Sequence, residues 1–172
     1  MKHVSLVVLF ALLAAGCGSK STATTPSTPA STNVTFTAAL LPSNEAPNPV
    51  SNAESVASGS ASIVFVLSKD AAGAITTAVG TATVTLQGFP AGSTITLAHI
   101  HTGPAGVAGG VLIGFVPGGA VALTSGAGSF SQTATITGSD AANIINNPAG
   151  FYFNVHSALN PGGVMRGQLK LQ

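Results

Sequence analysis

Charged side chains are scarce in this sequence. Only 5% of its 172 residues are Asp, Glu, Lys or Arg, and the formal net charge is +1. A nucleic-acid-binding surface needs clustered Lys and Arg, so we expect no nucleic-acid partner. The four acidic residues are scattered, which argues against a hydrolase built on paired carboxylates.

Cysteine and long apolar runs are nearly absent as well. The single Cys, Cys17, excludes an intramolecular disulfide. The apolar run from Val4 to Ala15 is shorter than the ~20 residues of a membrane-spanning helix, but it suits the apolar part of a signal peptide. Leu13 to Cys17 resembles a bacterial lipobox. We therefore expect residues 1–16 to be a signal peptide and Cys17 to carry lipid, palmitate included; the alternative is an ordinary secretory signal that contains a Cys.

Residues 17–32 consist almost entirely of Ser, Thr, Ala and Pro after the Cys. Such a segment cannot bury an apolar face, so we interpret it as a flexible tether. Lipid on Cys17 would then hold an exported protein at the cell envelope without a spanning helix. By analogy with bacterial lipoproteins, Gly18 after the Cys favours the outer membrane if the host is Gram-negative.

From residue 33 to residue 172 the chain consists of short β-prone runs separated by Gly, Pro, Asn and Asp. Eight strands are expected: Val34–Leu41, Ser60–Leu67, Ile75–Leu86 (bulged at Gly80), Thr94–His101, Val111–Val116, Ser129–Thr137, Phe151–His156 and Val164–Leu171. One helix, Asp140 to Asn146, is expected with Ser139 as its cap. The pattern predicts one all-β domain, an antiparallel immunoglobulin-like or Greek-key sandwich of about eight strands with one short helix.

Four short segments, in this order, resemble the CHRD (chordin) domain family over residues 33–172. They are Phe36–Leu40 leading to Glu45-Ala46-Pro47, Ala98–Gly106 with its His-Ile-His-Thr-Gly-Pro core, Phe151–Ser157, and Asn160–Leu169. The resemblance implies an extracellular β-sandwich of immunoglobulin size. In chordin the domain belongs to a binder of growth factors, but the resemblance implies no activity for bacterial members.

The remaining histidines after removal of residues 1–16 are His99, His101 and His156. Residues two apart in a strand share a face, with about 6.6 Å of rise between them. His99 and His101 could therefore bind one metal ion, with His156 from a neighbouring strand as the third ligand. Three histidines with an open position suit copper or zinc. The alternative is that they are structural and hydrogen-bond loop backbone.

Strand parity sets a condition on this metal site. If Phe151, Phe153 and Val155 face the core, His156 faces outward. In a regular strand, however, His99 and His101 share the face of Ile95 and Leu97, which would point inward. A common site therefore requires a bulge near Leu97-Ala98 that turns Ala98 and Ile100 inward.

Glu45, Arg166 and Asn154 lie inside the same segments and are expected to support the structure or the histidines. Burying an unpaired Arg is costly, which predicts a Glu45–Arg166 ion pair. Alternatively, Glu45 binds the metal or accepts a hydrogen bond from a histidine.

The leading hypothesis is a membrane-anchored, exported binding or interaction module without catalytic activity, whose partner is an unidentified envelope component or protein. The alternative is a metalloprotein that binds one copper or zinc ion through His99, His101 and His156. The His-x-His strand, later His and late Arg are also similar to Cu/Zn superoxide dismutase. The lack of a fourth His in the domain, of a zinc loop with Asp and of a disulfide argues against that activity.

Overall fold

The computed structural model describes residues 32–115 and 118–172. Residues 1–16, nearly all of the tether, and Val116 lie outside this range. Ten strands are described, in two antiparallel sheets. The first sheet has the order β10-β1-β2-β3-β7, with bounds Lys170–Leu171, Thr32–Leu40, Ser58–Lys69, Ile75–Gln87 and Gly128–Thr137. The second has the order β5-β4-β8-β9, with bounds Val111–Gly114, Ser93–Thr102, Phe151–Ser157 and Met165–Gln168, and β6 (Val121–Leu123) pairs with β4.

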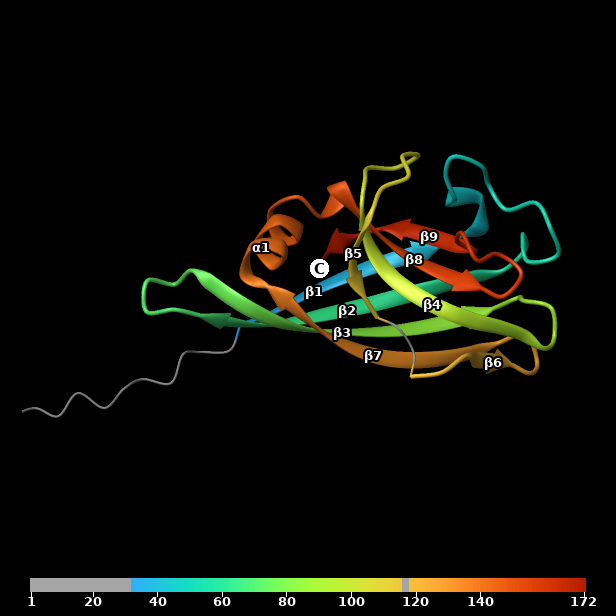
Figure 1. The fold of residues 1–172 in the computed structure, drawn as a ribbon, viewed down its shortest axis with the longest axis horizontal. Helices are drawn as coiled ribbons and strands as arrows, with labels where there is room; N and C mark the ends of the chain where they lie inside the picture. The colour runs from blue at the N-terminus through green and yellow to red at the C-terminus, as the bar shows by residue number, and fades with distance from the viewer. Residues whose placement is uncertain (1–31, 116–117) are drawn as a thin grey trace, which may run out of the picture.

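The core lies between these two sheets (Figure 1). In β2 the inward residues Ile63, Phe65 and Leu67 are buried, whereas Ser62 and Val66 on the opposite face are exposed. Burying each large apolar side chain contributes about 1.5–3 kcal/mol. The expected all-β sandwich with one short helix is therefore confirmed.

Gly80 in β3 does not form the expected bulge. It pairs in register with Phe65, and the irregularity between β2 and β3 falls instead between Ser68 and Lys69. A Cβ on Gly80 would lie 2.7 Å from Cδ1 of Ile136. The missing side chain thus makes room for core packing and leaves the strand pairing regular.

The helix α1 (Gly138–Asn146) begins two residues earlier than expected and is capped by a different residue. The Thr137 hydroxyl, rather than that of Ser139, accepts from the Asp140 backbone N–H. Ala141 and Ile144 are fully buried against the core. Within the described residues, no helix is long and apolar enough to cross a membrane.

The last expected strand is divided between the two sheets. β9 pairs with β8, whereas β10 pairs with β1. The break falls at Leu169, which is buried and whose N–H donates to the Phe151 carbonyl. Of the two 3-10 helices, η1 (Pro42–Asn44) contacts β9, and η2 (Pro148–Gly150) leads directly into β8 and contacts β9 as well.

Candidate metal centre

The strand β4 changes face before the histidine pair. Its register against β8 shifts between Ile95 and Leu97. Ile95 is fully buried in the core, and so are Ala98 and Ile100, although Ile95 and Ala98 are three positions apart and would lie on opposite faces of a regular strand. His99 and His101 therefore project from the outer face of the sheet. The predicted face switch is confirmed, one or two residues before the expected position.

His156 joins the pair from β8. Phe153 and Val155 pack in the core, which leaves His156 on the outer face next to β4. Nδ1 of His99 lies 3.2 Å from Nε2 of His156. One nitrogen from each of the three rings lies within 4.8 Å of the other two. The sequence-based grouping of the three histidines is thus confirmed.

Two loops hold the rings in place through backbone carbonyls. Nδ1 of His101 lies 3.0 Å from the Gly109 carbonyl oxygen, and Nδ1 of His156 lies 2.9 Å from that of Pro161. Because a carbonyl only accepts, both Nδ1 atoms carry the proton and both Nε2 atoms carry a lone pair. His99 then donates its Nδ1 proton to Nε2 of His156.

The lone pair on Nε2 of His101 has no hydrogen-bond partner. The atom is buried, and the His101 side chain is only 7% exposed. A buried acceptor without a partner costs about 1–3 kcal/mol. His99 and His156 are 9% and 7% exposed, so solvent does little to compensate for this loss. A metal ion bound among the three nitrogens would remove the penalty.

Burial and repulsion from neighbouring charges favour the neutral form of His99 and His101. Desolvation, followed by the charges of His156 and His101, lowers the pKa of His99 to about 4. Desolvation also lowers the pKa of His101, against the opposing effect of its bond to Gly109. Neutral imidazole is the form that binds metals, so the lowered pKa values of His99 and His101 favour metal binding at neutral pH.

Arg166 and Tyr152 form a stack beside the centre. The Tyr152 ring stacks on His101 with centroids 4.9 Å apart and an interplanar angle of 15°. Cζ of Arg166 lies 3.4 Å from the centroid of the same tyrosine ring, a cation–π contact. The importance of Tyr152 was not anticipated, although strand parity places the residue on the face of His156.

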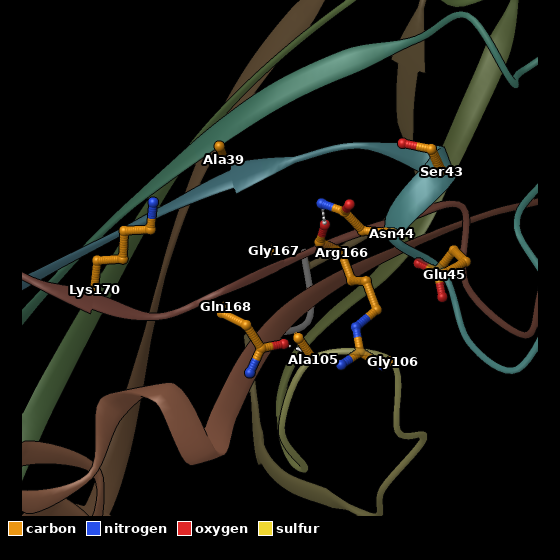
Figure 2. Close-up of a pocket in the computed structure, with 10 residues that line it drawn as sticks. All are labelled: Ala39, Ser43, Asn44, Glu45, Ala105, Gly106, Arg166, Gly167, Gln168 and Lys170. Carbon is orange, nitrogen blue, oxygen red and sulfur yellow. Dashed lines mark hydrogen bonds between the residues drawn. The ribbon is translucent and has the colours of Figure 1, made fainter.

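The expected ion pair between Glu45 and Arg166 is not formed. The guanidinium donates to the carbonyls of Val107 and Pro104 and to Oε1 of Gln168, each at 3.0 Å. These bonds hold the loop after β4, which satisfies the buried cation with neutral acceptors. Figure 2 shows the Arg166 side chain extending toward the Ala105–Gly106 loop and not toward Glu45.

Glu45 contacts Asn154 and no histidine nitrogen in the described structure. Nδ2 of Asn154 donates to Oε2 of Glu45 over 3.5 Å, a long bond, while Oε1 of Glu45 and Oδ1 of Asn154 are buried without partners. Desolvation raises the pKa of Glu45 to about 7, against the opposing effects of the Arg166 charge and the Asn154 bond. Glu45 also lines a pocket of ≈ 400 Å³ with Arg166 and Lys170 (Figure 2). The expectation that Glu45 binds the metal or a histidine is therefore wrong for this structure.

A second carboxylate supports the loop behind His156. Oε2 of Glu54 accepts from the Ser157 hydroxyl and from Nδ2 of Asn160, and Glu54 is 1% exposed. These contacts fix the turn that presents the Pro161 carbonyl to His156. Nothing in the local sequence around Glu54 distinguished it from a surface turn residue, and it was not predicted.

The donor set matches the chemistry of copper or zinc. Imidazole nitrogens suit both metals, and the 3.2 Å separation between the nitrogens of His99 and His156 is compatible with two bonds of about 2.0–2.1 Å to one ion. A metal that takes Nδ1 of His99 would move the proton of that ring to Nε2.

Comparison with known proteins gives one result. The model of the CHRD domain family matches residues 36–169. No curated protein and no solved structure matches the chain. The matched range includes both histidine strands, Glu45 and Arg166. On this match across most of its length, the chain belongs to the CHRD domain family.

Proposed function

We propose that this protein is an exported binding module that holds one copper or zinc ion through His99, His101 and His156. Two observations carry the proposal: Nε2 of His101 is buried without a hydrogen-bond partner, and one ring nitrogen from each of the three histidines lies within 4.8 Å of the other two. If His101 had only a structural role, we would expect both of its ring nitrogens to form hydrogen bonds within the protein. Only Nδ1 does so, and Nε2 is left available to bind a metal ion.

Membership of the CHRD family supports a binding module. The described residues around the three histidines add no general base or nucleophile in hydrogen-bond contact with the rings, and a non-catalytic function follows most simply. We place the module at the cell envelope, anchored through lipid on Cys17 and carried on the Ser/Thr/Pro tether. Its macromolecular partner is an unidentified protein or envelope component.

The metal is tested with untagged protein that starts at Gly18, because this chain keeps every described residue and contains three histidines. After dialysis against copper or zinc and then against metal-free buffer, elemental analysis should find one ion per chain. His101→Ala and His156→Ala should each reduce retention at least tenfold.

Lys69→Ala is the matched control and should retain the metal, because Lys69 is the partly exposed last residue of β2, in the sheet that carries no histidine. Circular dichroism should show that the histidine variants are folded. Wild-type protein that retains neither copper nor zinc, or folded histidine variants that retain as much as the wild type, would contradict the proposal.

A further inference from the structure

The strongest fixed charge near the histidines is that of Arg166. Its side chain is 1% exposed, and its guanidinium stacks on the tyrosine ring that in turn stacks on His101. A guanidinium remains protonated at all physiological pH values. Each metal ion that enters the centre therefore does so against a buried positive charge one aromatic ring away.

No carboxylate neutralises this charge by direct contact in the described residues. The hydrogen bonds of the guanidinium go to two backbone carbonyls and to the amide of Gln168. Glu45, the acidic residue whose charge acts on Arg166, has a carboxyl group that burial drives toward the neutral form. Glu54 is bonded to Ser157 and Asn160. The positive field of Arg166 is thus weakly compensated.

The ligands themselves bring no negative charge. All three are imidazoles, and the acceptors behind His101 and His156 are carbonyls, whereas zinc-bound histidines commonly have a carboxylate behind them. A divalent ion would keep its full charge in a buried site beside Arg166. Coulomb repulsion is proportional to the ion's charge, so a monovalent ion suffers half the penalty.

Burial also limits the number of ligands. All three rings are more than nine-tenths buried, and neither of the two pockets described beside Glu45 has a histidine on its wall. Zinc takes four ligands in nearly all protein sites, with water as the fourth where three are histidines. A monovalent copper ion is satisfied by three nitrogens and needs no water.

We propose that the three-histidine centre is selective for Cu(I) over Zn(II) and Cu(II), because the buried Arg166 charge and the uncharged ligand set penalise divalent ions. The selectivity rests on the proposed metal-binding function and adds the identity and oxidation state of the ion. Arg166 contributes as a positioning and electrostatic residue, since it touches Tyr152 and the loop carbonyls rather than the ion.

The test is a competition between metals for the Gly18-onward protein. Cu(I), buffered anaerobically with bicinchoninate and ascorbate, is measured against Zn(II) and aerobic Cu(II), each buffered with a chromophoric chelator. We expect Cu(I) to bind at least about a hundredfold more tightly than either divalent ion. An affinity for Zn(II) or Cu(II) equal to or greater than that for Cu(I) would contradict the proposed selectivity but would still support the proposed metal site. If the protein binds none of the three ions, the proposed metal-binding function is refuted as well.

Variants separate charge from packing. Arg166→Gln removes the charge and should narrow the ratio of Cu(I) to Zn(II) affinity about tenfold, whereas Arg166→Lys keeps the charge and should preserve the ratio. Glu45→Gln removes the only carboxyl group whose charge acts on Arg166 in the described residues, a group that burial already drives toward the neutral form, and should not narrow the ratio. A ratio that is the same in Arg166→Gln as in the wild type would contradict the electrostatic account. If the Arg166 variants do not fold, the Cu(I)-to-Zn(II) affinity ratios of the wild type and of Glu45→Gln test the proposal. A wild-type ratio near one, or a narrower ratio in Glu45→Gln, would then contradict it.

Discussion

At the scale of single residues, several buried polar atoms on the outer face of the second sheet have no hydrogen-bond partner. The buried side-chain atoms without partners in the described residues are Oε1 of Glu45, Nε2 of His101 and Oδ1 of Asn154. All three belong to side chains on this face or on the loop over it. With Nδ1 of His101 protonated, all three are acceptors. Unpartnered acceptors attract a cation or a proton, and the proposed metal ion would satisfy the nitrogen among them.

The other two acceptors, Oε1 of Glu45 and Oδ1 of Asn154, lie at a carboxyl group that makes the stability of the folded protein depend on pH. The folded-state pKa of about 7 is above the ordinary glutamate value of 4.5 because burial disfavours the charged carboxylate. The folded protein therefore binds the proton more tightly than the unfolded chain. The contribution of Glu45 to stability is present below pH 4.5 and is lost as the pH rises through about 7.

Glu45→Gln should remove this dependence. A glutamine stays neutral, and its amide can donate to Oδ1 of Asn154, which now lacks a donor. We expect the metal-free variant to unfold with about 1 kcal/mol more free energy than the wild type at pH 8, and with a smaller difference at pH 5. Urea unfolding in the presence of a chelator at both pH values measures the two differences.

Glu54→Gln is the matched control. The Glu54 carboxylate is buried but already accepts from Ser157 and Asn160, so the amide should reduce stability at both pH values. A stability difference between Glu45→Gln and the wild type that does not grow from pH 5 to pH 8 would contradict the account of Glu45.

At the scale of elements, the proposed centre consists of two strands that carry the histidines and two loops that orient them. The loop after β4 brings the Gly109 carbonyl to His101, and Arg166 and Gln168 hold that loop through its carbonyls. The loop after β8 brings the Pro161 carbonyl to His156. The family segments around Arg166 and Asn160 thus support the histidines without binding the ion.

Gly109→Ala should disturb the first loop selectively. A Cβ at this position would lie 1.6 Å from the Thr102 carbonyl oxygen, so the backbone that carries the acceptor of His101 must move. We expect a loss of about 2 kcal/mol in stability and a tenfold to hundredfold loss of metal affinity, because the orienting bond is weakened. Thermal unfolding and metal competition measure these two effects.

The adjacent glycine provides the control. A Cβ on Gly110 would have no neighbour within 4 Å, so Gly110→Ala should change stability by less than about 0.5 kcal/mol and retain metal affinity. Equal metal affinities for the two alanine variants would mean that the Gly109 carbonyl does not orient His101.

The sequence was sufficient for the parts of the site that depend on strand parity. Alternation in β8 placed His156 outward, and the requirement that His99 and His101 join it predicted the face switch in β4. The predicted ion pair between Arg166 and Glu45 was wrong because the contacts of these side chains depend on loops, and loop sequences have no periodicity from which a conformation could be predicted. The predicted cap, Ser139, was wrong for a similar reason. Both Ser139 and Thr137 lie near the start of the helix, and only the backbone geometry determines that Thr137 is the cap.

At the scale of the whole molecule, the fold separates an apolar core from a polar outer site. The sandwich is stabilised by the aromatic and aliphatic residues between its sheets, and the histidines lie on the opposite face of the second sheet. Loss of the metal should therefore leave the fold intact. We likewise expect the proposed anchor to act independently of the domain, because Cys17 precedes β1 in the sequence.

Cys17→Ser tests the anchor in the native host. If Cys17 is lipidated, the wild-type protein should incorporate labelled palmitate and sediment with membranes. The variant should incorporate none and should be recovered in the soluble fraction. Membrane sedimentation of an unlabelled Cys17→Ser protein at the wild-type level would show that Cys17 does not anchor the chain.

The most direct measurement of the central claim is X-ray absorption spectroscopy of the metal-loaded protein. The account predicts one ion per chain, bound by three imidazole nitrogens at about 2.0 Å, with the imidazole scattering reduced in His101→Ala. A coordination shell dominated by oxygen, or one with no more than one imidazole, would contradict the assignment of His99, His101 and His156 as the metal ligands.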